Sequence, residues 1–175
     1  MHFFTADEHY GHSNIIKYCN RPYADVEEMN EDIIEKHNAV VKAGDFVIHA
    51  GDFTFRSQPK YAERLNGSNI FIKGNHDNWL KKTNAPHIWS RKLYGVHIVV
   101  CHYALRSWDR SHFNSWNLHG HTHGRLDSIG KQLDVGVDTN EYRPYSFDEV
   151  YAIMETKEDN IGLIEDKYKR VNHGK

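Results

Sequence analysis

Short apolar runs recur along the chain, and most of them stop at a glycine or at a cluster of polar residues. These runs cover residues 1–5, 46–50, 69–73, 96–101, 116–119 and 131–137. They are rich in β-branched and aromatic residues, a composition that is typical of strands. The pattern therefore predicts strands whose ends carry polar side chains.

Three other segments have the signals of helices. After Asp25, a good N-cap, apolar residues recur at helical spacing over 26–40. The capping-box sequence S-F-D-E opens a helix over 146–156, and a proline begins a short helix over 59–65. Strands alternate with helices early in the chain and dominate later, which predicts an α/β or mixed α+β fold.

The composition suits a globular protein and limits its partners. A length of 175 residues predicts one domain, 1–175, with the lysine-rich end 166–175 as a loose tail. The net charge of −2 gives no reason to expect strong binding to nucleic acid. The sequence has no evident signal peptide, membrane span or disulfide scaffold. We therefore expect a cytoplasmic protein without a membrane partner; its oligomeric state stays open.

Histidine is the unusual feature of the composition, with 14 in the chain. Many of these histidines fall in five polar clusters that follow predicted strands: Asp7-Glu8-His9, Gly51-Asp52, Gly74-Asn75-His76-Asp77, His102 and Gly120-His121-Thr122-His123. Carboxylates, a carboxamide and imidazoles are the donors that bind divalent metals. If a sheet delivers all five clusters to one edge, they are able to hold two ions about 3.5–4 Å apart.

Taken singly, each cluster also has an ordinary explanation. Asp52 after Gly51 is typical of a turn, and Asp7 is a reasonable helix N-cap in a loop. His121 and His123, two imidazoles at positions i and i+2 between glycines, are the hardest to explain by packing. A structural zinc site is the alternative for this pair, but no cysteine is nearby to complete the usual sulfur-rich shell. The ordered set, rather than any one cluster, favours a metal site.

The ordered set resembles the signature of the calcineurin-like metallophosphoesterase superfamily. That signature is D-x-H, then G-D, then G-N-H-D/E, then a lone His, then G-H-x-H, and every element is present. The resemblance covers residues 3–124, with weaker support from 133–138. Residues 7–16 are similar to the first motif of small bacterial and phage-type members without a cap domain. The resemblance implies a four-layer αββα fold, in which helices flank a two-sheet β-sandwich.

The resemblance also implies a role for each cluster. One metal ion would be bound by Asp7, His9 and His123. The other would be bound by Asn75, His102 and His121. Asp52 would bridge the two ions, and a water activated between them would be the nucleophile. Mixed oxygen and nitrogen donors do not select one metal sharply, so we expect Mn²⁺, with Ni²⁺, Zn²⁺ or Fe²⁺ as alternatives.

Other residues would act on the substrate. His76 would be catalytic and not a metal ligand, because it would contact the phosphate or protonate the leaving oxygen. Nearby donors would meet the phosphate charge: His12, Arg21 and Arg56. Ser/Thr phosphatases of the superfamily carry a second aspartate where this chain has Phe55, which weakens a protein-phosphatase interpretation. Asp77 is a candidate substitute support for His76.

The substrate is the least determined part of the prediction. The leading hypothesis is a phosphoesterase acting on phosphodiesters of small nucleotides. A nuclease on single-stranded or structured nucleic acid is one alternative, and a non-catalytic scaffold with the same fold is another. Aromatic and arginine residues over 103–114 would be able to stack a base and hold a phosphate, or would form an ordinary packed loop.

Overall fold

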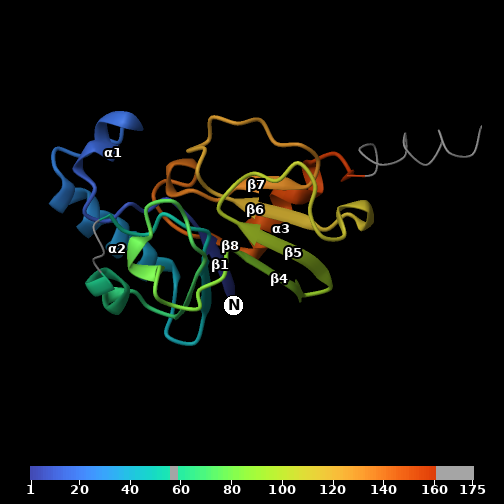
Figure 1. The fold of residues 1–175 in the computed structure, drawn as a ribbon, viewed down its shortest axis with the longest axis horizontal. Helices are drawn as coiled ribbons and strands as arrows, with labels where there is room; N and C mark the ends of the chain where they lie inside the picture. Colours follow the sequence, from blue (N-terminus) through green and yellow to red (C-terminus); the bar gives the residue numbers. More distant parts are fainter. Residues whose placement is uncertain (56–58, 161–175) are drawn as a thin grey trace, which may run out of the picture.

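Two four-stranded sheets form the centre of the computed structural model (Figure 1), which describes residues 1–55 and 59–160. The first sheet has the strand order β3-β2-β1-β8, and the second has the order β4-β5-β6-β7. The strands of the first sheet are β1 (His2–Thr5), β2 (Phe46–His49), β3 (Ser68–Phe71) and β8 (Tyr145–Ser146). Those of the second are β4 (Ile88–Leu93), β5 (Val96–Cys101), β6 (Trp116–His119) and β7 (Gln132–Asp134).

The strand interiors alternate between two faces, as a pleated strand requires. Phe3 of β1 packs with Val47 on one side of the first sheet. Phe4, the next residue, belongs to the main core together with Ile98 and Leu118 of the second sheet. The two sheets therefore pack face to face across a common apolar layer.

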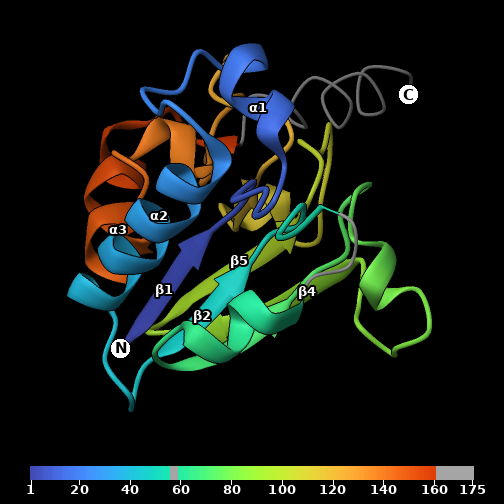
Figure 2. The ribbon, with the colours of Figure 1, turned by 90° about the vertical axis from the view of Figure 1, so that its left-hand side faces the viewer.

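In the described residues, three α-helices flank this sandwich: α1 (Ser13–Tyr18), α2 (Val26–Val40) and α3 (Phe147–Thr156). The Asp25 side chain accepts a hydrogen bond from the Glu28 amide at 2.9 Å, which fixes the start of α2. The predicted capping box opens α3. In Figure 2, α2 and α3 lie to the left of β1, and α1 lies beyond the carboxyl end of that strand.

Parallel pairing brings the polar clusters to one edge of the sandwich. Strands β1, β2 and β3 are parallel in the first sheet, as are β5, β6 and β7 in the second. Among the strands that the structure describes, only β8 and β4 run antiparallel to their neighbours. Each polar cluster follows one of the parallel strands, so the clusters lie beyond carboxyl ends, where ligands bind in open α/β sheets.

The predicted fold class, two sheets flanked by helices, is confirmed, and several local predictions need correction. The sequence pattern does not predict strand β4 or helix α1. The segment over 59–65 forms a 3₁₀-helix, η1 (Pro59–Arg64), and strand β7 ends at Asp134 and not at residue 137. The remaining described 3₁₀-helices are η2 (Asn78–Leu80), η3 (Ser111–Phe113) and η4 (Val137–Thr139).

The outer face of the second sheet is covered in part by the loop that follows β5. The Leu105 amide donates to the Asn117 side chain of β6 at 3.1 Å, which holds this loop against the sheet. None of the described helices is long and apolar enough to cross a bilayer. The predicted tail, 166–175, lies outside the described residues.

Candidate metal centre

The predicted metal ligands come from both sheets and meet at the edge described above. Asp7 and His9 follow β1, Asp52 follows β2, and Asn75 comes after β3. From the second sheet, His102 follows β5 directly. His121 and His123 come after β6. The structure therefore brings all seven predicted ligands into one region of the molecule.

The first group of donors consists of Asp7, His9 and His123, whose ligand atoms all lie within 4.8 Å of one another. Asp7 Oδ1 and His9 Nε2 are 3.9 Å apart. Both atoms are buried and have no hydrogen-bond partner. Buried polar atoms without partners are costly, and a cation between them would satisfy both. These residues fit the metal ion that the ligand types imply.

The second group consists of Asp52, His102 and His121, again with ligand atoms within 4.8 Å of one another. The Ala50 carbonyl accepts a hydrogen bond from His102 Nδ1 at 2.9 Å. In the neutral imidazole, Nε2 then carries a lone pair. That lone pair faces Asn75 Oδ1 at 2.9 Å and Asp52 Oδ2 at 3.4 Å. Three acceptor atoms facing one another are what a second cation requires.

Asp52 joins the two groups. Its Oδ2 lies 3.7 Å from His9 Nε2 and 3.4 Å from His102 Nε2, one histidine from each group. Before a cation binds, a proton on His102 Nε2 takes its place. Burial opposes ionisation of the Asp52 carboxyl, but the hydrogen bond and the charge of this protonated His102 lower its pKa to about 2. The carboxylate is therefore charged at neutral pH and placed to contact a cation on either side.

Asp7 has the opposite electrostatic balance. Burial raises its pKa to about 8, because the carboxylate is removed from water and the neighbouring histidines only partly compensate. An ionised Asp7 thus needs a nearby positive charge.

The backbone at the cluster is strained in a consistent way. Five of the seven predicted ligands, none of them glycine, have positive φ angles: Asp7 (57°), His9 (55°), Asp52 (55°), His121 (70°) and His123 (49°). Such conformations cost free energy in residues with a side chain and gather at functional sites. The strain therefore marks these loops as shaped by something other than local propensity.

Two motif glycines are needed because other groups approach their α-carbons closely. A Cβ on Gly74 would lie 2.2 Å from Asp52 Oδ1, and one on Gly120 would lie 2.5 Å from Asp7 Oδ2. Neither position has room for a methyl group. Gly74 thus makes room for a carboxylate from the neighbouring strand of its own sheet, and Gly120 makes room for one from the other sheet.

Two aspartates that were not predicted as site residues support the histidine loop. Asp134 Oδ2 accepts from the Gly124 amide at 2.9 Å and from the Thr122 hydroxyl at 2.5 Å. Asp138 Oδ2 accepts from His123 Nδ1 at 2.7 Å. Carboxylates commonly orient metal-binding histidines in this way. The only signal in the sequence was the segment over 133–138, which carried the weaker part of the resemblance.

The predicted role of Arg21 in binding phosphate needs correction. Its side chain is 0% exposed, and all five guanidinium N–H groups have partners. Two go to the Asp138 carboxylate, at 2.8 and 2.7 Å, and others reach the Asp7 and Glu8 carbonyls. Arg21 therefore fixes the loop that carries the first ligands and has no donor left for a substrate.

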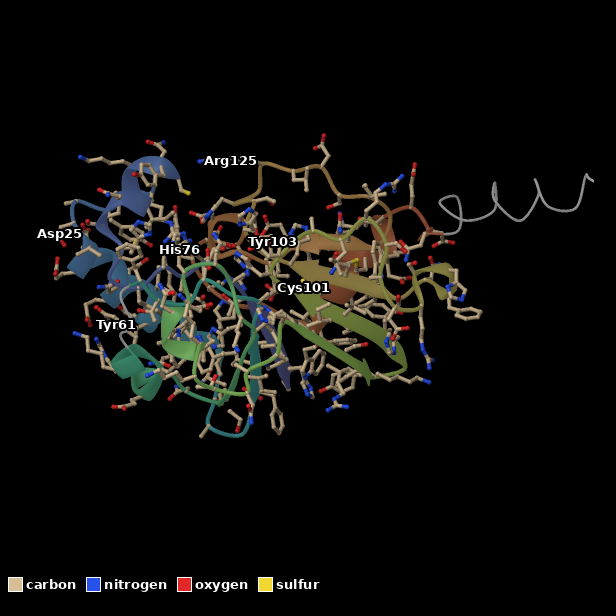
Figure 3. The ribbon with its side chains drawn as sticks, viewed as in Figure 1. Asp25, Tyr61, His76, Cys101, Tyr103 and Arg125 are labelled. Carbon is tan, nitrogen blue, oxygen red and sulfur yellow. The ribbon has the colours of Figure 1, made fainter. Side chains whose placement is uncertain are left out.

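His76 lies beside the cluster but belongs to neither group of donors. Its side chain is 38% exposed, and its Nε2 is 3.9 Å from Asp52 Oδ2. Figure 3 shows it left of the middle of the molecule, with Tyr103 to its right. The His76 amide donates to Asp52 Oδ1 at 2.8 Å, so the backbone fixes its position.

Asp77 does not support His76 as suggested from the sequence. Its carboxylate accepts from the amides of Asp52, Phe53 and Gly74 at 2.8, 3.0 and 2.9 Å. It also accepts from the Trp79 indole at 3.1 Å. Asp77 therefore joins the loops that follow β2 and β3.

His12 lies close to the first group of donors. Its Nδ1 is 3.3 Å from His9 Nδ1, and its ring stacks on Phe55 with centroids 4.2 Å apart. His12 is 8% exposed, and its contact with His9 Nδ1 places it to orient that ligand. Arg56, the third predicted phosphate donor, lies outside the described residues.

The aromatic loop over 103–114 does not lie at the metal groups as a whole. Trp108 is buried. Arg110 and Phe113 line a pocket of about 430 Å³ with Val96 and Trp116, the first residues of β5 and β6. The metal ligands follow the other ends of those strands. Arg110 and Phe113 are therefore too far from the cluster to stack a base there.

Comparison with known proteins agrees with this architecture. Residues 3–167 match the family model described as calcineurin-like phosphoesterase, and the chain belongs to that family. An uncharacterized protein of Methanocaldococcus jannaschii is 34% identical over 165 residues, covering 87% of this chain and 90% of that protein. Family membership supports a metal-dependent phosphoesterase in general.

A solved structure supports the fold independently. The crystal structure of a protein of unknown function from Aquifex aeolicus superposes with a TM-score of 0.67 at 24% identity. The match covers 87% of this chain and 98% of that one. At this identity the likeness concerns the fold alone.

Proposed function

We propose that this protein is a two-metal phosphoesterase that hydrolyses phosphodiesters of small nucleotides. The observation that supports this most directly is the position of Asp52 Oδ2, 3.7 Å from His9 Nε2 and 3.4 Å from His102 Nε2. The unpartnered Asp7 Oδ1 and His9 Nε2 add to it. One carboxylate between two sets of lone pairs is the arrangement that a pair of divalent ions would use.

The division of ligands follows from the two groups. Asp7, His9 and His123 would hold one ion. Asn75, His102 and His121 would hold the other, with Asp52 shared. When bound, two divalent ions supply Lewis acidity and a water that is acidic enough to act as a nucleophile near neutral pH. Because the donors are carboxylate, carboxamide and imidazole, we expect Mn²⁺, with Ni²⁺, Zn²⁺ or Fe²⁺ as alternatives.

His76 would transfer the proton that the leaving group needs. It is partly exposed, and its imidazole is not committed to either group of donors. Its amide is tied to Asp52 Oδ1, so the ring stays next to the shared carboxylate. Protonation of the departing ester oxygen from this ring would avoid release of an alkoxide.

The choice of a small nucleotide rests on charge and on the available donors. The net charge of −2 is poorly suited to a long polyanion, which weakens the nuclease alternative. The partly exposed His76 favours catalysis over a scaffold, which would not need an accessible imidazole at this position.

The proposal is tested by assaying the metal-reconstituted protein against a small panel. The panel contains a generic diester, a generic monoester, 2′,3′-cyclic and 3′,5′-cyclic nucleotides and single-stranded DNA, each with added Mn²⁺. We expect diester hydrolysis that EDTA abolishes and that Asp52→Asn removes. Preferential cleavage of DNA would replace the proposal with the nuclease. Inactivity of the metal-loaded protein on the whole panel would replace it with the scaffold.

A further inference from the structure

Tyr103 is an exposed aromatic residue placed against the second group of donors. It directly follows His102, and 47% of its surface is exposed. Its ring meets those of His102 and His121 edge-on, with centroids 5.0 and 4.9 Å apart. Its hydroxyl donates to Asn75 Oδ1 at 3.1 Å. The side chain thus touches three residues of one predicted metal site.

The loop that carries Tyr103 is held by side chains of two strands of the second sheet. Asn117 and Gln132 are buried amides on β6 and β7. Asn117 Oδ1 accepts from the Leu105 amide at 3.1 Å, and Gln132 Nε2 donates to the Leu105 carbonyl at 3.0 Å. The two amides also bond to each other at 2.7 Å. Both backbone groups of Leu105 are therefore fixed two residues after Tyr103, so its exposure is part of an ordered structure.

The hydroxyl of Tyr103 is held by a weak partner. Asn75 Oδ1 is a neutral amide oxygen, whereas the oxygens of a phosphoryl group are anionic. A hydrogen bond to an ionised acceptor is roughly twice as strong as one between neutral groups. A phosphoryl oxygen arriving beside Asn75 would therefore compete successfully for this donor.

We infer that Tyr103 is a substrate-contacting residue whose hydroxyl donates to an oxygen of the bound phosphoryl group. The inference rests on the proposed function, because it places the phosphoryl group at the second group of donors. It adds a donor that the family motifs do not include and that contacts the second group of donors, whereas His12 contacts His9 of the first. The ligand chemistry required is a phosphate or a phosphate ester.

The test compares Tyr103→Phe with the unaltered protein. Both are loaded with Mn²⁺, their metal content is measured, and inorganic phosphate is titrated into each by calorimetry. We expect equal metal content and phosphate binding that is weaker by about tenfold to a hundredfold in the variant, the scale of one bond to a charged group. In the diester assay, KM should rise while kcat changes little.

Tyr94→Phe is the matched control. Tyr94 is also an exposed tyrosine, and its hydroxyl is 3.0 Å from His2 Nδ1, at the turn between β4 and β5. This variant should bind phosphate like the unaltered protein. Equal phosphate affinity in Tyr103→Phe would overturn the inference, and so would loss of metal, which would make Tyr103 a support for Asn75. If the protein hydrolyses nothing, the calorimetric difference still tests the contact, so the two failures are distinguishable.

Discussion

The Asp138 carboxylate lies 2.7 Å from His123 Nδ1 and also accepts hydrogen bonds from Nε and Nη2 of the Arg21 guanidinium. Because a carboxylate only accepts, His123 Nδ1 must carry the proton, and Nε2 is the atom left for a metal. Burial opposes the charge on His123, but Asp138 and Cys19 raise its pKa to about 10, so a metal bound at Nε2 would displace a proton from that atom. Arg21 thus reaches the metal centre indirectly, by fixing the residue that orients one ligand.

Replacing Asp138 should weaken metal binding without removing a ligand. We expect Asp138→Asn to lower affinity for the first ion by about 10–100-fold, the usual effect of losing such a support. Metal titration of the apo-protein measures this. Asp109→Asn is the control, because Asp109 makes a similar contact to His97 at 3.0 Å on an exposed part of the second sheet. Equal effects of the two variants would show that Asp138 has no special role.

Replacing Asp52, which faces both groups of donors, and replacing His9, which belongs to one, should have different effects on metal content. Asp52→Asn is expected to reduce occupancy of both ions, since Asp52 Oδ2 faces histidines of both groups. His9→Ala should mainly affect one ion. Elemental analysis after reconstitution separates the two patterns. Loss of both ions from His9→Ala would mean that the groups do not fill independently.

His76 should matter for turnover and not for metal content. His76→Ala is expected to keep both ions and to lose roughly 10²–10⁴ in rate, the scale of a positioned proton donor. The loss should be smaller for a nitrophenolate leaving group, which needs less protonation. Parallel measurement of kcat on two esters and of bound metal checks this. If the variant is stripped of a metal, His76 is a ligand and the assignment is wrong.

A methyl group on Gly74 should disrupt the centre. In Gly74→Ala the new Cβ would lie 2.2 Å from Asp52 Oδ1 and 2.4 Å from the Asp52 amide nitrogen. Backbone and carboxylate must both move, at a cost of about 1–3 kcal/mol or more in unfolding free energy, with loss of metal. Gly44→Ala is the control, because a Cβ added at Gly44 would have no neighbouring atom within 4 Å. Chemical denaturation and metal analysis of both variants give the comparison.

Stability should fall in mildly acidic solution, in part through His37. Burial lowers its pKa to about 4 from 6.5, while its Nε2 donates to the Asn66 carbonyl at 3.0 Å. Below about pH 6.5, His37 takes up a proton in the unfolded chain but stays neutral in the folded chain. The contribution of His37 to the unfolding free energy is therefore complete above pH 6.5 and is lost as the pH falls toward 4. The difference between these two pKa values corresponds to about 3 kcal/mol.

His37→Gln isolates that contribution. Glutamine keeps a donor for the Asn66 carbonyl but does not titrate. The unfolding free energy of the variant should therefore fall less steeply between pH 6.5 and pH 4 than that of the unaltered protein. Parallel curves for the two proteins would show that His37 is not responsible.

The predicted ligands converge because each of their clusters comes soon after an apolar strand, and parallel strands carry their ends to one edge. The role of Arg21 was not predictable in the same way. Its side chain is held by Met29 of α2 and by Asp138, which lies 117 residues further along the chain. Strand β4 escaped prediction because it is an edge strand with several exposed residues and lacks a continuous apolar run.

Each group of donors takes side chains from both sheets. Asp7 and His9 belong to the first sheet and His123 to the second, and Asn75 faces His102 in the same manner. Ions bound at these positions would cross-link the two sheets, so separating the sheets would require breaking coordination bonds. A ligand that binds only the folded chain stabilises it in proportion to the logarithm of its concentration. Metal starvation would then shorten the lifetime of the folded protein as well as silence its chemistry.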